Sequence, residues 1–320
     1  MTGGISDTGR PPAIFALERT AGNAFLHKFR EPSTLKHVND SAPTRPTQAG
    51  PKRFAPPSIE ELNSTIPGYE LSLMFNLDDT GALYRARHTT LDRDVCIKIL
   101  PPPPEVENGG YLESFRTEAH TMAKLHHPNI IKVYDSGETT SGLPYFVMEY
   151  VEGSILRRMI DFGQISMEHV LGWIPPLCEA LQYAHLQGIV HCDVRPSNIL
   201  LTFDGEVKLA NFRLSRVSAH GVPGFAASTV HAAPEMHEEG TVIDYRADIY
   251  SLGVVLYEML TGRLPIGSFA PASTVAGVDP RFDDIIRGAL QPDRDARWQT
   301  ALDISTLVCQ IRDYPASGTE

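Results

Sequence analysis

Hydrophobic and polar positions change their spacing about halfway along the chain. Between residues 69 and 151, short segments rich in β-branched and aromatic residues alternate with turn residues, which is typical of strands. One longer segment in this region has apolar residues at helical spacing. The expected strands are 69–75, 82–88, 94–100, 130–136 and 145–151, and the expected helix is 112–125.

Beyond Gly153 the apolar positions follow helical spacing for most of the remaining chain. A block of strands with one helix, followed by a helical block, predicts an α+β protein with two lobes. No internal repeat is present in the sequence. The helices expected in the second lobe are 167–187, 247–261, 283–290 and 298–311.

The two ends of the chain differ from this pattern. Residues 1–57 are rich in Pro, Gly, Ser and Thr, and only Ile14 to Phe29 has amphipathic spacing. Their apolar content is too thin to offset the entropy of ordering, so a disordered tail is expected. Ser58 and Glu61 have the capping-box spacing, which predicts a short lead-in helix within 58–68. The lobes then span 69–151 and 152–313, and residues 314–320 form a second tail.

Composition narrows the range of functions. The chain has 320 residues, 28 of them basic and 39 acidic, for a formal net charge of -11, which argues against nucleic-acid binding and adhesion to an anionic membrane. Cys96, Cys178, Cys192 and Cys309 form no C-x-x-C pair, so we expect a reducing cytoplasm and neither a zinc site nor a disulfide framework. The sequence has no signal peptide pattern and no apolar run of about 18 residues, so no direct membrane insertion is expected.

A series of short motifs carries the candidate chemistry. Each motif is weak when it stands alone, but the series occurs in one order and in fitting strand, helix and loop contexts. The most informative member has the spacing H-x-D-x-x-x-x-N. In chain order the motifs are Val95–Lys98, Glu118, Met148–Val151, His191–Asn198, Asn211–Arg213, Ala233–Glu235, Asp248 and Arg297.

From about Tyr69 to Asp313, this series resembles the bacterial Ser/Thr protein kinases of the eukaryotic, or Hanks, type. The resemblance implies a bilobal protein-kinase fold with a five-stranded N-terminal lobe and a mainly helical C-terminal lobe. It also implies ATP and Mg²⁺ or Mn²⁺ as cofactors, and a protein substrate or another protein partner.

The resemblance assigns a role to each retained residue. Lys98 would contact the α- and β-phosphates, and Glu118 would hold Lys98 in place. Asp193 would accept the proton of the substrate hydroxyl, and Arg195, where the family has lysine, would reach the γ-phosphate.

Asn198 and Asn211 are the implied metal ligands. Glu235, Asp248 and Arg297 are expected to be structural, as a buried ion pair and a carboxylate that braces a loop. The remaining nucleotide contacts implied by the resemblance come from Phe75, Gly81, Leu83, Cys96, Lys98, Met148, Glu149, Val151 and Leu200.

The phosphate-binding loop departs from the family pattern. When Tyr84–Ala86 is aligned with the family's Y-K-A, the three glycine positions fall at Asn76, Asp78 and Gly81. Only Gly81 survives, although glycines let backbone N–H groups approach phosphates closely. A carboxylate about 5 Å from a phosphate charge costs roughly 3 kcal/mol at an effective dielectric near 20. Nucleotide binding is therefore expected to be weak or lost.

The catalytic segments depart as well. Asn211 stands where the family's D-F-G motif has its magnesium-binding aspartate, and Arg213 replaces the glycine of that motif. An amide oxygen brings no negative charge to a hard cation that favours carboxylates. Cys192 replaces the arginine that often binds an activation-loop phosphate, and His231 replaces the tyrosine beside the peptide pocket.

These losses favour a pseudokinase that acts as a signalling or binding module. The retained residues leave a second hypothesis open, a slow Ser/Thr kinase with atypical metal use. Asp193 alternatively braces its own loop, and Lys98 with Glu118 is alternatively an exposed ion pair. Arg213 has three interpretations: a cation near the phosphates, a partner of Asp78 or Asp193, or a solvated side chain.

Overall fold

The computed structural model describes residues 54–78, 80–102, 111–212, 230–238 and 240–315. The predicted N-terminal tail up to residue 53, and the C-terminal tail from residue 316, lie outside these ranges. Four side chains of one helix, including that of Glu118, also lie outside the description.

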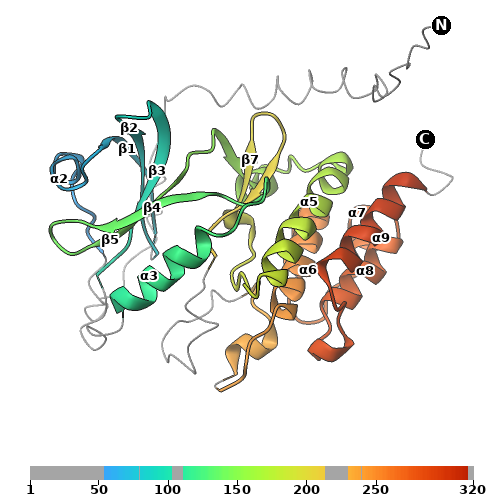
Figure 1. Ribbon diagram of the computed structural model, residues 1–320. Helices are drawn as coiled ribbons and strands as arrows, with labels where there is room; N and C mark the ends of the chain where they lie inside the picture. Colours follow the sequence, from blue (N-terminus) through green and yellow to red (C-terminus); the bar gives the residue numbers. More distant parts are fainter. Residues whose placement is uncertain (1–53, 79, 103–110, 213–229, 239, 316–320) are drawn as a thin grey trace, which may run out of the picture.

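The N-terminal lobe is built on one antiparallel sheet of five strands in the order β1-β2-β3-β5-β4. Figure 1 shows the sheet with α3 beside it at one side of the molecule. The bounds are α2 Ile59–Thr65, β1 Tyr69–Asp78, β2 Gly81–His88, β3 Arg93–Ile99, α3 Tyr111–Met122, β4 Val133–Glu138 and β5 Pro144–Glu149. The five strands and the helix predicted for this lobe are confirmed, with ends that shift by a few residues.

Alternation along β2 creates the core of this lobe. Ala82, Tyr84 and Ala86 are buried on one face of the sheet, where they meet buried residues of β3 and β5. Leu62 of α2 covers the same core, and Ser58 is the N-cap of this helix, because its hydroxyl accepts the Glu61 N–H. Burial of this apolar surface stabilises the sheet by about 25 cal/mol per Å².

Helices dominate the C-terminal lobe, which also holds a small three-stranded sheet in the order β6-β7-β8. In Figure 1, α5 to α9 lie side by side at the far side from the five-stranded sheet, and β7 lies between the two groups. The bounds are β6 Gly153–Ile155, α4 Leu156–Asp161, α5 Met167–Leu186, β7 Ile199–Thr202, β8 Val207–Leu209, α6 Arg246–Thr261, α7 Ala272–Ala276, α8 Arg281–Ala289 and α9 Ala301–Asp313.

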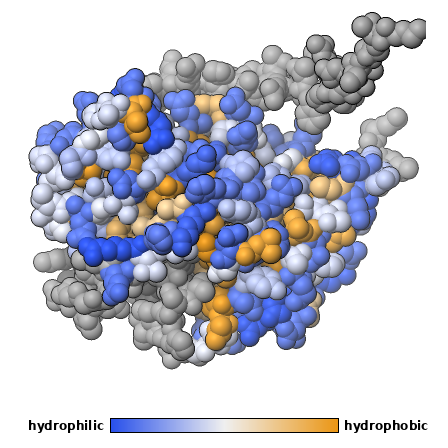
Figure 2. Space-filling view, viewed as in Figure 1, coloured by the Kyte–Doolittle hydropathy of each residue, from blue (hydrophilic) through white to orange (hydrophobic). Residues whose placement is uncertain are grey.

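The α+β class and the bilobal architecture are therefore confirmed. The sequence did not predict β6, β7, β8, α4 or α7, which have only three to six residues each and show no periodicity. The face seen in Figure 2 is mostly hydrophilic, with hydrophobic residues in scattered patches. Within the described ranges, no helix combines the length and apolar character needed to cross a bilayer.

A buried carboxylate fixes the loop before β7. Asp248 of α6 is fully buried and accepts the backbone N–H groups of His191 and Cys192, each at 2.8 Å. Its Oδ2 also bonds His185 Nε2 at 2.8 Å. Cys192 has a φ of +60°, a left-handed conformation that is unfavourable for a residue with a Cβ. The bonds to Asp248 hold this conformation, which confirms the predicted bracing role of Asp248.

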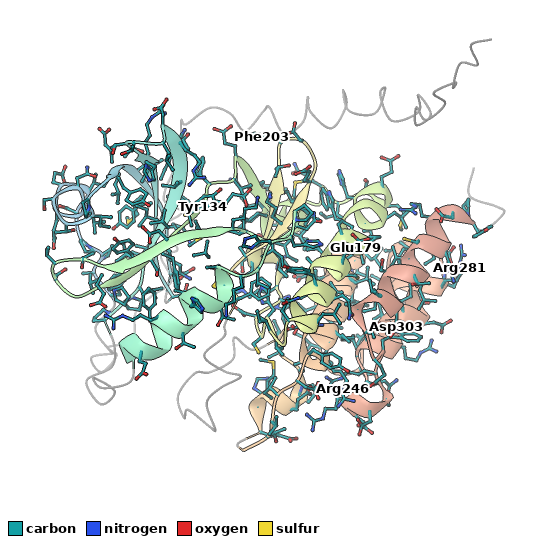
Figure 3. The ribbon with its side chains drawn as sticks, viewed as in Figure 1. Tyr134, Glu179, Phe203, Arg246, Arg281 and Asp303 are labelled. Carbon is teal, nitrogen blue, oxygen red and sulfur yellow. The ribbon has the colours of Figure 1, made fainter. Side chains whose placement is uncertain are left out.

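A buried ion pair joins the 3-10 helix Pro234–His237, which precedes α6, to the segment that precedes α9. Arg297 donates two parallel hydrogen bonds to Glu235, at 2.6 and 2.7 Å, and both residues are buried. Three backbone carbonyls, of Gln291, Arg246 and Pro292, accept its other N–H groups. The predicted structural pair is confirmed. Nearby, Arg246, labelled in Figure 3, binds Asp244 and Asp295.

Arg297→Met should lower the free energy of unfolding by about 3 kcal/mol or more, because it leaves the Glu235 carboxylate buried without its partner. Urea denaturation followed by circular dichroism measures this loss. Arg287→Met is the matched control, since Arg287 forms an exposed ion pair with Asp284 and should unfold close to wild type. Equal losses for the two variants would contradict a structural role for Arg297.

Candidate functional site

The loop between α5 and β7 carries the H-x-D-x-x-x-x-N motif. The imidazole ring of its histidine, His191, connects two segments of the backbone through hydrogen bonds. The Asp193 N–H donates to His191 Nδ1 at 3.1 Å, so the ring proton lies on Nε2, which donates to the Ala210 carbonyl at 2.9 Å. Burial lowers the pKa of His191, although Asp248 and Asp193 act in the opposite direction. The neutral ring thus ties the loop to the residue that precedes Asn211.

Asp193 and Asn198 are joined within the same loop. Asn198 Nδ2 donates to the Asp193 carbonyl at 2.8 Å and to its carboxylate Oδ2 at 2.9 Å. Asn198 is 5% exposed and ends a 3-10 helix, Pro196–Asn198, that leads into β7. The structure therefore brings the predicted base and one predicted metal ligand into direct contact.

Asn211 extends this contact toward the other lobe. Its Nδ2 donates to Asn198 Oδ1 at 2.9 Å, and its Oδ1 accepts from Lys98 Nζ at 3.3 Å. Asn211 has a φ of +63°, which asparagine tolerates better than most residues with a Cβ. Lys98, Asn211, Asn198 and Asp193 thus form one continuous chain of hydrogen bonds, named the cleft relay below, from β3 to the catalytic loop.

The cleft relay is a poor fit for magnesium. The two amide oxygens predicted to ligate a cation, Asn198 Oδ1 and Asn211 Oδ1, each accept a hydrogen bond from a neighbouring donor. Asp193 is the only carboxylate among its four members. Magnesium is bound mainly through carboxylates, so a cation would have to break existing bonds and would gain little charge in return.

The turn between β1 and β2 is stabilised by hydrogen bonds to the side chain of Asp78, which lies within it. The Asp78 carboxylate accepts hydrogen bonds from Thr80 N at 2.8 Å, Thr80 Oγ1 at 2.6 Å and Asn76 Nδ2 at 3.3 Å. Burial disfavours the charged form, but the bonds from Thr80, the charge of Lys98 and the bond from Asn76 outweigh it. The pKa of Asp78 therefore lies below the ordinary value.

Gly81, the surviving glycine of this turn, is required by packing. It has a φ of +135°, and a Cβ added there would lie 2.3 Å from the Ile99 carbonyl oxygen of β3. This close approach explains why Gly81 is retained in a loop whose other two glycine positions are substituted.

The positions predicted to contact a nucleotide lie on five strands, β1, β2, β3, β5 and β7, and on the segment that follows β5. Cys96 of β3 pairs with Met148 of β5, and Met148 packs against a small cluster around Phe115 and Phe146. Burial raises the pKa of the Cys96 thiol to about 12, so it is an apolar surface at neutral pH. Leu83 of β2 pairs with Lys98, Leu200 of β7 pairs with Ile155, and Val151 is half-buried after β5.

Three predicted residues have protein partners of their own. The Phe75 ring meets the Tyr150 ring edge-on at 6.2 Å. The Glu149 carboxylate binds Lys208 of β8 at 2.9 Å, an ion pair that joins the two lobes. Arg195 Nε donates to Ser197 Oγ at 2.5 Å. The predictions for Arg213 and for the Glu118 side chain lie outside the described residues.

His231 belongs to a polar cluster that the sequence reasoning missed. Glu258 of α6 accepts from Arg157 Nη1 at 2.6 Å and bonds His231 Nε2 at 2.9 Å. Burial disfavours its charge, but the bonds from His231 and Arg157 hold the pKa of Glu258 below its usual range. A single acid inside the apolar stretch 252–259 was the signal available in the sequence.

Comparison with known proteins identifies this arrangement. The family model described as a protein kinase domain matches residues 79–306. The chain belongs to the protein kinase family. The Ser/Thr-protein kinase PknB of Mycolicibacterium smegmatis is 34% identical over 273 residues, which cover 78% of this chain and 43% of that protein. A probable PknB of Bifidobacterium longum is 35% identical over 272 residues, covering 74% of this chain and 39% of that protein.

The relatives are bacterial Ser/Thr kinases of the Hanks type, as the sequence motifs predicted. This chain spans about two fifths of the length of these curated relatives. A crystal structure of the Mycobacterium tuberculosis PknI kinase domain, a double mutant, has the same fold, with a TM-score of 0.65 and 26% identity. That match covers 77% of this chain and 96% of the PknI chain.

Glu258→Gln should lower the free energy of unfolding by about 2 kcal/mol at pH 7, because it removes the charge that Arg157 and His231 face. The folded pKa of Glu258 is depressed, so its contribution is present above the unfolded pKa and is lost as pH falls through the folded pKa. The difference from wild type should therefore shrink as the pH falls below about 4. Glu179→Gln, on the exposed face of α5 (Figure 3), is the control for urea titrations at each pH.

Asn211→Asp should create a response to divalent cations. The carboxylate cannot donate to Asn198 Oδ1, so two acceptors would face each other, and a cation between them relieves the repulsion. Manganese should raise the melting temperature of this variant by several degrees and leave wild type within about one degree. Gln187→Glu, on an exposed turn, adds the same charge elsewhere and should behave as wild type. A manganese shift of equal size in wild type would contradict this view of the cleft relay.

Proposed function

We propose that this kinase domain is a pseudokinase, a protein-binding module of a signalling system with little or no phosphotransfer activity. The observation that carries the proposal is the bonding of Asn211. Its amide connects Lys98 to Asn198, where phosphoryl transfer would need a carboxylate that holds magnesium. The family's metal would neutralise much of the charge that develops during transfer, and this chain has no carboxylate at position 211 to hold it.

Two further features support the proposal. The Asp78 carboxylate lies at the tip of the β1–β2 turn, where it adds negative charge in the region that the family uses for phosphates. His231 binds Glu258, and the side chain of a peptide-pocket residue is therefore engaged within the C-terminal lobe. Metal, nucleotide and substrate recognition are thus weakened together, while the fold is retained.

The partner is a protein, by the same proposal. Members of this family act on protein substrates, and the same class of partner is proposed for this chain by analogy of fold. The charge of -11 makes nucleic acid an unsuitable partner.

One observation favours a second candidate, a slow Ser/Thr kinase. Asp193 remains oriented by Asn198, and Lys98 remains within reach of the same relay. A base that is positioned in this way retains part of the machinery for accepting a hydroxyl proton.

Phosphotransfer from γ-labelled ATP to the chain itself and to a generic basic protein tests the proposal, with magnesium and with manganese. We expect no incorporation above that of Asp193→Asn. Incorporation by wild type that Asp193→Asn abolishes would overturn the pseudokinase proposal and establish the slow kinase. Incorporation that persists in Asp193→Asn comes from contaminating kinases. Glu70→Gln, an exposed substitution on β1, controls for the effect of a substitution as such and should behave as wild type.

A further inference from the structure

The β1–β2 turn has a bonding pattern of its own. In a phosphate-binding turn, backbone N–H groups point toward the ligand and remain available to it. Here the Thr80 N–H donates to Asp78 Oδ1 at 2.8 Å, and the Thr80 hydroxyl donates to the same oxygen at 2.6 Å. Asn76 Nδ2 holds the other carboxylate oxygen at 3.3 Å. The described donors of the turn, those of Thr80 and Asn76, are thus directed to an anion that the chain itself supplies.

The charge of Lys98 also favours an ionised Asp78 in this turn. The charge of Lys98 stabilises the ionised form of Asp78, so the two groups lie within electrostatic range. Lys98 also donates to the neutral amide of Asn211. Asp193 adds a second carboxylate at the far end of the cleft relay. A phosphate that entered this region would meet the carboxylates of Asp78 and Asp193 as well as Lys98. Position 211 has no carboxylate to recruit a metal.

We propose that Asp78 is an internal substitute for a ligand phosphate, and that the cleft consequently prefers an adenine-type ligand without phosphates over ATP. This inference rests on the proposed function of the cleft and specifies its ligand class. Asp78 acts as the residue that determines specificity. It uses the donors that a phosphate would need and repels the phosphate by its charge.

The base and the phosphates of a nucleotide are expected to contact different residues of the cleft. The positions predicted to contact the base are apolar, including Leu83, Met148 and Leu200, and the Cys96 thiol is protonated. Asp78 does not change these apolar positions, because it lies at the tip of the hairpin opposite Gly81. Its effect should therefore depend on the phosphates of a ligand and be absent for adenosine.

The size of the effect follows from the charge. A unit charge about 5 Å away in a medium of dielectric near 20 corresponds to roughly a hundredfold change in affinity. Asp78 is exposed, and solvent screens it, so about tenfold is the appropriate expectation.

Isothermal titration calorimetry of the full chain with adenosine and with ATP, both in EDTA, tests the proposal. Wild type should bind adenosine at least about tenfold more tightly than ATP. Asp78→Asn keeps an oxygen for the Thr80 donors but removes the charge. It should bind ATP about tenfold more tightly than wild type does, and adenosine within about twofold. Asp78→Ser, a second neutral variant, should give the same change.

Glu70→Gln is the matched control, because it removes one exposed carboxylate from the same strand far from the turn. It should leave both affinities unchanged. The proposal is overturned if wild type binds ATP as tightly as adenosine, if it binds neither ligand, or if neutralising Asp78 changes both affinities equally. None of these outcomes depends on turnover, so the phosphotransfer assay tests the pseudokinase proposal separately.

Discussion

The side chain at position 211 lies between a hydrogen-bond donor and a hydrogen-bond acceptor. Lys98 offers an ammonium donor on one side, and Asn198 presents a carbonyl oxygen on the other. A carboxylate accepts from both directions and donates in neither, so an aspartate there would face Asn198 Oδ1 as a second acceptor unless a cation lay between them. An amide has one acceptor and two donors and bonds both neighbours directly. The identity of this one residue therefore decides whether the cleft is complete without a metal.

The cleft relay depends on supports that lie deeper in the C-terminal lobe. Asp248 holds the backbone at His191 and Cys192, and the His191 ring in turn holds the Ala210 carbonyl beside Asn211. These bonds are buried, and breaking one leaves an uncompensated polar group in the core. Because these bonds contribute to the stability of the fold, they maintain the geometry of the loop independently of any catalytic requirement. The same scaffold therefore positions Asp193 whether or not phosphoryl transfer takes place.

The sequence predicted the long, periodic elements of the fold and the identity of most site residues, but it could not predict their partners. Alternation gave β2, whereas β8, with three residues, has no period to detect. Asn211 was recognised as a lost metal ligand, but the direction of its two hydrogen bonds depends on where Lys98 and Asn198 lie in space. Glu258 was missed, because its partners Arg157 and His231 are distant in sequence.

Asn211 and Asp78 are physically equivalent substitutions at two ends of one cleft. The amide of Asn211 joins side chains that a metal would otherwise join, and the carboxylate of Asp78 occupies donors that a phosphate would otherwise occupy. Each replaces an interaction with a bound group by a bond within the chain. A bond within the chain does not require a ligand from solution. Its formation therefore does not depend on ligand concentration, unlike the interaction with a bound group that it replaces. Under the proposed function, these bonds keep the site assembled at all nucleotide concentrations, as a constitutive binding module requires.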